Sequence, residues 1–272
     1  MTTTGHEAVP DRSGIAPAYA AARSRLALVA VMLGLAAVSW WWTAREMQNM
    51  DGGPWTELGT AAWFLGVWVV MMAAMMFPSV APTVALYSKL KHTRGLGAPL
   101  AFTSGYLLVW SGAGVVVYAL ARIGGVAVGG VLGWGSGGRW IAGATLLGAA
   151  AYELTPLKDV CLGKCRTPLG FLIGNWRDGL GGAVRMGARH GAWCVGCCWA
   201  LMASLFALGV MSLVWMAVVA GLIAFEKLIP SRRLATCGTA ALLLALGMLM
   251  FVAPDSVPGL TNPGADMLQM RP

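Results

Sequence analysis

The stretch LATCGTAALLLALGMLMFV at residues 234–252 decides the fold class, because its 19 residues include no charged side chain. A helix of about 20 mostly apolar residues is long enough to cross the hydrocarbon layer of a membrane. The rest of the chain is similar in character, with 58% hydrophobic and 11% charged residues and a mean hydropathy of +0.70. Soluble domains carry roughly 25% charged residues. The sequence therefore predicts an all-α fold, a polytopic membrane helix bundle.

Seven segments are apolar and long enough, or nearly so, to be transmembrane helices. They cover residues 26–42, 60–77, 98–121, 140–156, 193–209, 211–228 and 234–252. A further glycine-rich stretch, 123–138, is apolar but short, and we expect a re-entrant or interfacial segment there, or an extension of the neighbouring helices. Its Gly125, Gly129 and Gly133 recur every four residues, a spacing that permits close helix contact.

The basic residues predict how the bundle is oriented. Fifteen of the 19 lysine and arginine residues lie before the first expected span or in alternate connections between spans. Short cytoplasmic segments of membrane proteins carry such an excess of basic residues. We therefore expect a cytoplasmic N-terminus and an odd number of spans. The net charge of +8 is assigned to this orientation and not to nucleic-acid binding.

The sequence indicates one bundle with two short tails. Residues 1–25 are polar and predict a disordered cytoplasmic tail, residues 26–253 form the transmembrane bundle, and residues 254–272 form a short extracytoplasmic tail. Inside the bundle, residues 158–190 form an amphipathic cytoplasmic segment. We expect this segment to be a helix that lies on the membrane surface.

The run HGAWCVGCCWALM gathers side chains that bind metals. His190, Cys194, Cys198 and Met202 follow at intervals of four, so they lie on one face of a helix. Cys197 is seven residues after His190 and shares that face. The run begins at the cytoplasmic entrance of the fifth expected span, which places these ligand atoms near the inner membrane surface.

The remaining cysteines map to the same side of the membrane. Cys161 and Cys165 follow the inner end of the fourth expected span, and Cys237 begins the seventh. Stable disulfides are rare in the reducing cytoplasm, and clustered Cys and His residues there bind metals or perform redox chemistry. Thiolates suit Cu(I), Zn(II) or an iron–sulfur cluster. The alternative is that each cysteine is a small buried residue that only packs.

The run WVVMMAAMMFPS, near the inner end of the second expected span, is rich in methionine. Met71 and Met75 share one helix face, and Met72 and Met76 share another. Thioethers are soft, neutral ligands that select Cu(I), although flexible methionines also fill gaps in a core. We expect this stripe to pack against the cysteines, and we expect Pro78 to break the helix.

Two carboxylates lie at the inner ends of expected spans. Glu153 ends the fourth span and Glu226 the sixth, and ionisable groups at such positions usually face the interior of a bundle. Either could be a metal ligand or a proton acceptor. Glu226 has the simpler alternative of pairing with its neighbour Lys227, whereas Glu153 has no such neighbour and is the better candidate for a ligand.

Several of these motifs resemble a known family. The run MMAAMMFPS, the pattern Tyr-Glu-x-Thr-Pro-x-Lys-x-x-Cys-Leu and the pattern His-Gly-x-x-Cys-x-x-Cys-Cys-Trp are similar to those of a bacterial family of predicted metal-binding integral membrane proteins, a domain of unknown function, over residues 60–252. The resemblance implies a location in the bacterial inner membrane and metal binding, but no reaction. It implies a ligand set of Met71, Met72, Met75, Met76, Glu153, Cys161, Cys165, His190, Cys194, Cys197 and Cys198.

Three functions are compatible with these patterns. The first is metal handling or delivery, with a soft ion, Cu(I) before Zn(II), bound at the cytoplasmic side and exchanged with a metal-donor or metal-acceptor protein. The second is a membrane thiol oxidoreductase that uses Cys194 and Cys197, whose reactivity would be raised by a helix N-terminus. The third is a non-catalytic membrane subunit with structural zinc. The sequence shows no phosphate-binding loop and no hydrolase motif, which favours a role without catalysis.

Overall fold

The computed structural model describes residues 15–48, 59–88, 96–128, 139–208 and 212–253. All regular secondary structure in these ranges is helical, so the expected all-α fold is confirmed. The helices are α1 (Ile15–Gln48), α2 (Ala61–Tyr87), α3 (Gly97–Val128), α4 (Arg139–Glu153), α5 (Pro156–Arg166), α6 (Pro168–Gly174), α7 (Gly179–Leu208), α8 (Leu213–Leu228) and α9 (Arg232–Val252).

Within the ranges that the structure describes, four helices have the length and composition to cross a membrane. The apolar stretches are Leu26–Glu46 in α1, Ala61–Tyr87 in α2, Gly97–Gly124 in α3 and Arg232–Val252 in α9. Helices α4 and α8, with 15 and 16 residues, are shorter than the roughly 20 residues that a span requires. The other expected spans fall on α4, α7 and α8.

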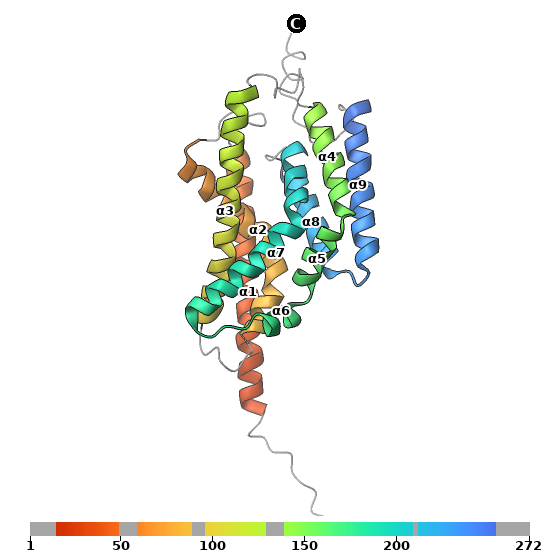
Figure 1. Ribbon diagram of the computed structural model, residues 1–272. Helices are drawn as coiled ribbons and strands as arrows, with labels where there is room; N and C mark the ends of the chain where they lie inside the picture. The colour runs from red at the N-terminus through yellow and green to blue at the C-terminus, as the bar shows by residue number, and fades with distance from the viewer. Residues whose placement is uncertain (1–14, 49–58, 89–95, 129–138, 209–211, 254–272) are drawn as a thin grey trace, which may run out of the picture.

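The helices form two groups that are joined by α7 (Figure 1). Helices α1, α2 and α3 pack together on one side, and α4 packs along α9 on the other. Helix α7 contacts α3, α4, α5 and α8, so it connects both groups. The first turns of α1, the short helices α5 and α6, and the turn between α8 and α9 lie toward one end, while α9 finishes at the other (Figure 1).

Helices α3 and α7 approach so closely that glycine is required at their crossing. A Cβ atom on Gly105 would collide with the backbone carbonyl of Val184, and one on Gly187 would collide with that of Phe102. The missing side chains let the two backbones touch. This crossing fixes the first half of α7 against α3, directly before the cysteines.

Helix α2 does not break at Pro78, so this expectation was wrong. The helix continues through Pro78 and Pro82 to Tyr87. Pro78 has no N–H to donate to the carbonyl of Ala74. The indole Nε1 of Trp40 on α1 donates to that carbonyl instead, at 3.1 Å, and so satisfies the group that proline leaves free.

The segment 158–190 differs from the single surface helix that we expected. It contains most of α5, all of α6 and the first part of α7. Both short helices begin with a Thr-Pro pair, and the proline takes the first helical turn, where no N–H is needed. Helix α7 begins at Gly179, whose φ of 77° is readily adopted only by glycine. These breaks in the sequence divide the segment into three.

The ends of the bundle can be compared with the expected tails only in part. Helix α1 begins at Ile15, within the segment 1–25 that we expected to be disordered. This segment ends in an alanine-rich run, and alanine has the highest intrinsic helix propensity. The expected C-terminal tail, 254–272, lies outside the described residues, as do residues 129–138 of the glycine-rich stretch.

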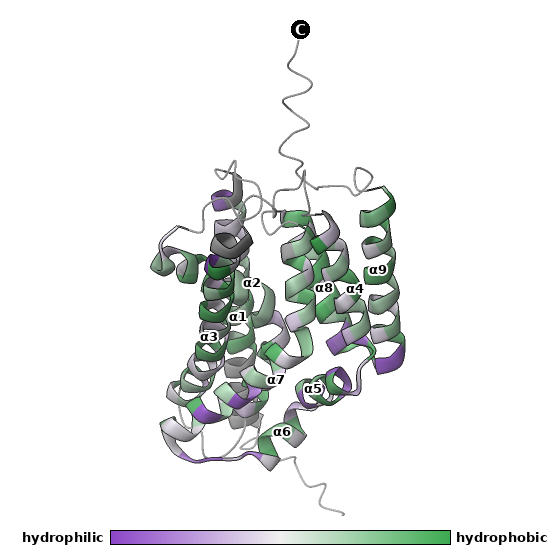
Figure 2. Cartoon of the chain, turned by 45° about the horizontal axis from the view of Figure 1, so that its top comes forward, coloured by the Kyte–Doolittle hydropathy of each residue, from purple (hydrophilic) through white to green (hydrophobic). Residues whose placement is uncertain are grey.

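The outer surface of the bundle is apolar as well as its core. Helix α9 buries Leu243 and Met250 but exposes Leu244, Met248 and Val252. Figure 2 shows hydrophobic residues along α4, α8 and α9, with hydrophilic residues near the turn before α9 and on parts of α5. A helix that is apolar on all faces is typical of a protein core or of a membrane span.

Candidate metal centre

The cysteines of α7 lie in the middle of a continuous 30-residue helix. Cys194, Cys197 and Cys198 are each 1% exposed, and their spacing turns them toward the interior of the bundle. The α7 helix begins 15 residues before Cys194. The expectation that the Cys-x-x-Cys pair stands at a helix N-terminus was therefore wrong, because the expected surface helix and the fifth span are one helix. The free N–H groups that would activate such a pair are absent here.

Three thiols from two helices converge on one point. The Sγ atoms of Cys165 on α5 and of Cys194 and Cys197 on α7 all lie within 4.8 Å of one another. The Sγ atoms of Cys165 and Cys197 are 3.7 Å apart. Two sulfur atoms that each lie about 2.3 Å from one metal ion are separated by about 3.8 Å in a tetrahedral site and about 4.6 Å in a linear one. The three thiols therefore fit a single soft metal ion with little movement.

Cys161 and Cys198 flank this group of three thiols. Cys161 lies against Gly196 of α7. A Cβ atom added to Gly196 would be only 2.9 Å from the Sγ atom of Cys161. Gly196 thus permits α5 to approach α7. Cys198 donates its S–H to the carbonyl of Cys194 at 2.9 Å, an ordinary contact for a buried thiol in a helix. Their proximity makes both residues potential secondary ligands.

The thiol of Cys194 has two further polar neighbours. The Nζ atom of Lys227 on α8 lies 3.3 Å from its Sγ atom, and the hydroxyl of Tyr106 on α3 lies 3.1 Å from it. Lys227 also donates to the hydroxyl of Ser79 on α2, at 3.1 Å. A cation beside this sulfur stabilises a negatively charged thiolate or thiolate–metal complex. Sequence reasoning missed these partners, because only the tertiary packing brings them to Cys194.

One residue of the methionine stripe, Met76, packs beside a thiol. Met71, Met72, Met75 and Met76 are all buried, and the Sδ atom of Met76 lies 4.0 Å from the Sγ atom of Cys194. Met76 is therefore the methionine best placed to add a thioether ligand. The ligand roles of the other three methionines stay predictions, and their burial is also what packing in the core requires.

His190 stands one helical turn before Cys194 on α7. Its side chain is buried among the rings of Phe102, Tyr106 and Phe171, with ring centroids 6.0, 6.1 and 4.9 Å away. Its Nδ1 atom is buried without a hydrogen-bond partner. The imidazole is not one of the groups that converge with the three thiols. Its role as a ligand stays a prediction.

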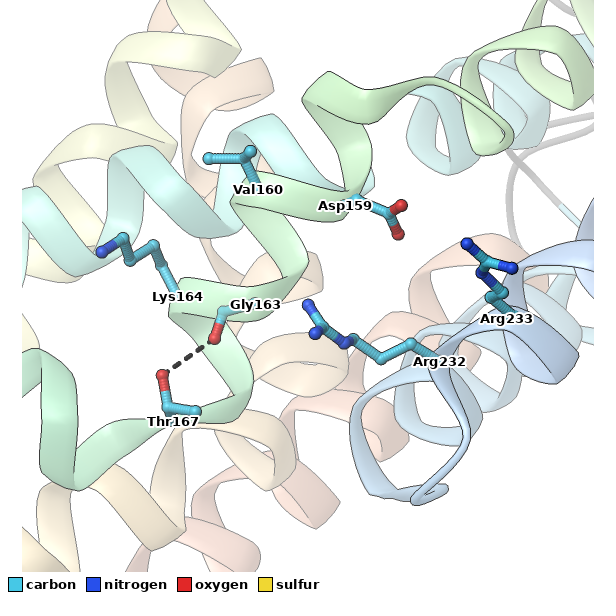
Figure 3. Close-up of a pocket in the computed structure, with 7 residues that line it drawn as sticks. All are labelled: Asp159, Val160, Gly163, Lys164, Thr167, Arg232 and Arg233. Atoms are coloured by element: carbon cyan, nitrogen blue, oxygen red, sulfur yellow. Dashed lines mark hydrogen bonds between the residues drawn. The ribbon is translucent and has the colours of Figure 1, made fainter.

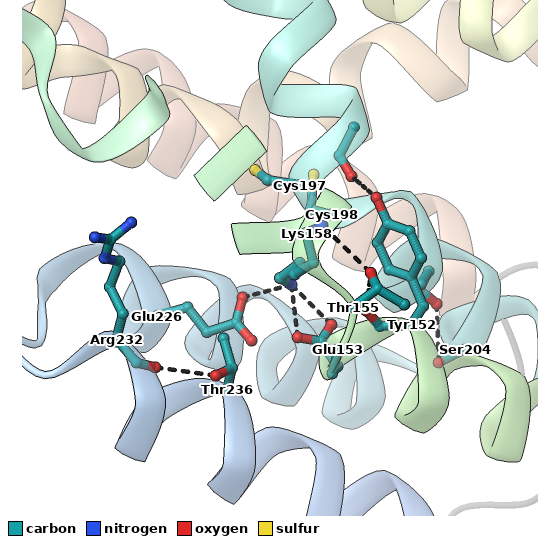
Figure 4. Close-up of polar contacts among 12 residues, drawn as sticks. Tyr152, Glu153, Thr155, Lys158, Cys197, Cys198, Ser204, Glu226, Arg232 and Thr236 are labelled. Carbon is teal, nitrogen blue, oxygen red and sulfur yellow. Dashed lines mark hydrogen bonds and ion pairs between the residues drawn. The ribbon is translucent and has the colours of Figure 1, made fainter. Parts of the chain in front are cut away.

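Glu153 takes part in a buried ion triad with Lys158 and Glu226 (Figure 4). The Nζ atom of Lys158 lies 2.7 Å from the carboxylate of Glu153 and 2.8 Å from that of Glu226, and all three side chains are at most 2% exposed. Burial lowers the pKa of Lys158, but the charges of Glu226 and Glu153 outweigh burial and raise it above its usual value. Lys158 is therefore a stable cation.

This triad changes the roles expected for the two carboxylates. Glu153 is engaged by Lys158, and Glu226 pairs with Lys158 and not with its neighbour Lys227. Lys227 is thereby free to contact Cys194. The sequence contained one signal for the first pair: Lys158 follows Glu153 by five residues, across a Thr-Pro helix start that can turn the chain back.

Cys237 is separate from the other five cysteines. It lies in the second turn of α9 and is exposed, whereas Cys161, Cys194, Cys197 and Cys198 are buried and Cys165 is partly exposed. Cys237 is a natural control for experiments on the cluster.

These features define a helical protein with a preformed thiol centre of the kind that binds soft metal ions. Comparison with known proteins agrees with this class. A family model described as "PpoB2: Copper chaperone" matches residues 65–250, which is more than half of the chain. The chain belongs to this copper chaperone family. No curated protein and no solved structure matches it.

The ion triad predicts a large loss of stability when Lys158 is replaced by Met. Two carboxylates would then be buried without a cation, and breaking a buried ion pair in this way costs about 3–5 kcal/mol. Thermal or denaturant unfolding in detergent measures the change. Lys164→Met is the control, since Lys164 is exposed on the same helix. Adding Glu153→Gln and Glu226→Gln to the Lys158 variant should restore stability. A Lys158→Met protein as stable as the original would contradict the triad's role.

The contact between Lys227 and Cys194 predicts weaker metal binding when Lys227 is replaced by Met. Hydrogen bonds to charged groups contribute about 1.5–3 kcal/mol, so the Kd for Cu(I) should rise about 10- to 100-fold. Competition with a Cu(I) chelator measures it. Lys227→Arg retains the positive charge and should lose less affinity. An unchanged Kd for Lys227→Met would show that the cation does not support the bound metal.

Proposed function

We propose that the protein is a seven-span protein of the bacterial inner membrane with a cytoplasmic N-terminus. Support comes from the apolar outer surfaces of its helices and from the distribution of basic residues. The helix ends that carry these residues, in α5, the start of α7 and the start of α9, belong to the part of the bundle nearest the beginning of α1 (Figure 1). The thiol centre would then lie on the cytoplasmic side.

In our proposal the bound ion is Cu(I), held by the thiolates of Cys165, Cys194 and Cys197. The observation that carries it is the convergence of these three thiols in a chain of the copper chaperone family. Thiolate and thioether donors select Cu(I) over harder ions. The nearby Met76 supplies such a thioether, and Lys227 offsets part of the negative charge of the thiolates.

The different exposure of the ligands suggests how the ion is passed on. Cys194 and Cys197 are buried, whereas Cys165 is partly exposed. A thiolate of an acceptor protein would bind the copper ion as Cys165 leaves it, and the thiol proton given up by the acceptor would be taken up by Cys165 or by solvent. The copper remains Cu(I) throughout. Cys165 is thus the exchangeable ligand, and the two buried cysteines are the last to release the ion.

Replacing Cys194 and Cys197 together by Ser should abolish stoichiometric copper binding. Serine hydroxyls are poor ligands for soft ions, while packing between helices should keep the protein folded. Elemental analysis of protein purified with copper and zinc available measures the content, and circular dichroism confirms the helices. Cys237→Ser should keep its full copper content.

Other outcomes of this measurement would exclude the proposal. A double variant with full copper content would place the ion elsewhere. Stoichiometric zinc in the original protein would support the structural alternative, and a redox-active thiol pair without metal would support the oxidoreductase.

The proposed topology predicts the behaviour of reporter fusions. A fusion after Arg177, between α6 and α7, should be active only with a reporter that works in the cytoplasm. A fusion after Pro272 should be active only with one that works outside it, because an odd number of spans separates this position from the N-terminus. Cytoplasmic activity at both positions would contradict a seven-span bundle.

A further inference from the structure

A cationic pocket opens between α5 and the first turn of α9 (Figure 3). Its volume is about 540 Å³. Its lining includes Asp159, Val160 and Lys164 from α5, Thr167 directly after α5, and Arg232 and Arg233 from α9. The lining thus holds three cations and one carboxylate. The pocket lies on the exposed side of α5 and is separate from the buried thiols.

The protein does not balance the positive charge of this pocket. Among the residues that the structure describes, Asp159 forms no salt bridge with Lys164, Arg232 or Arg233. Arg166, beside the pocket, donates to the carbonyls of Ile229 and Pro230, yet its Nη1 atom is buried without a partner.

The start of α9 adds to this excess of positive charge. Ser231, its N-cap residue, makes no side-chain hydrogen bond to the first turn, and that turn holds no acidic residue. Arg232 and Arg233 stand there instead, where the helix dipole disfavours cations. Free N–H groups at a helix start and two arginines together form a good site for an anion such as a phosphate group.

Apolar side chains beside the pocket indicate where the anion comes from. Leu228 and Leu234, on the two sides of the turn before α9, are 76% and 74% exposed, and Val160 in the lining is 53% exposed. Exposed leucines next to arginines match the boundary between acyl chains and headgroups in a membrane. A free phosphate ion would make no use of these apolar surfaces.

We propose that this pocket binds the phosphate-bearing headgroup of an anionic phospholipid, with Arg232, Arg233 and Lys164 as its cationic contacts. The acyl chains would lie along Leu228 and Leu234. The Nη1 atom of Arg232 lies 3.0 Å from the Cβ position of Gly163, so the bound headgroup would connect α9 to α5. The inference rests on the proposed membrane location but does not depend on copper binding.

Binding of a short-chain phosphatidylglycerol to the full chain in neutral detergent tests this. Native mass spectrometry or calorimetry gives the Kd. Replacing both Arg232 and Arg233 by Gln should raise this Kd about 30-fold, since each basic residue near a membrane surface contributes roughly a fivefold factor. Arg185→Gln with Arg189→Gln is the matched control. It removes two exposed arginines from α7, outside the pocket, and should leave the Kd nearly unchanged. Lys164→Gln is a milder second variant should the double variant not fold.

Each other outcome would overturn the proposal. Equal weakening in the pocket variant and the control would mean general charge attraction, and an unchanged Kd in both R232Q/R233Q and K164Q would exclude the pocket. If inorganic phosphate or glycerol phosphate binds as tightly as phosphatidylglycerol, the ligand is a free phosphate and not a lipid. Copper content is measured on the same preparations. A failure of lipid binding with full copper content would therefore leave the proposed copper function intact.

Discussion

The position of α5 depends on the buried ammonium group of Lys158. Charges removed from water are stable only when hydrogen-bonded partners surround them, so Lys158 must remain within bonding distance of Glu153 on α4 and Glu226 on α8. Both bonds are shorter than 3 Å, which leaves α5 little freedom to slide. Cys161 and Cys165 follow Lys158 on the same short helix. The ion triad thereby determines where these two thiols stand in relation to the rest of the bundle.

The other half of the centre is placed by close contacts of α7. Gly105 and Gly187 let α7 touch α3, which brings Tyr106 to Cys194, and Gly196 lets α5 approach from the opposite side. Packing and ion pairs thus hold the three thiols close together. Ligands that the fold already positions avoid the cost of ordering on binding. The proposed centre differs in this respect from small domains that fold only around their metal.

The sequence predicted the parts of this arrangement that have a local signature. The length of the apolar segments predicted the helices, and the spacing of four residues placed Cys194 and Cys198 on one face of α7. Contacts between distant segments had no such signature: Lys227 follows Cys194 by 33 residues and Tyr106 precedes it by 88. The continuation of α2 past Pro78 depends on an indole from another helix. A proline such as Pro78 predicts a helix break from the local sequence. A donor from another helix can satisfy the carbonyl that proline leaves free, and the helix then continues.

Ligand type favours Cu(I) over Zn(II) in the proposed centre, whereas charge does not. Cu(I) with the three thiolates carries two negative charges, of which Lys227 neutralises one. Zn(II) with three thiolates and Lys227 would be neutral, so charge alone does not select Cu(I). Zn(II), however, usually takes a fourth thiolate, imidazole or carboxylate ligand. Beside Cys194 stands the thioether of Met76, while His190 is packed among aromatic rings and Glu153 is bound to Lys158. A thioether is a ligand that Cu(I) accepts readily and Zn(II) does not, so in the proposed copper site Met76 would be the residue that favours Cu(I) over Zn(II).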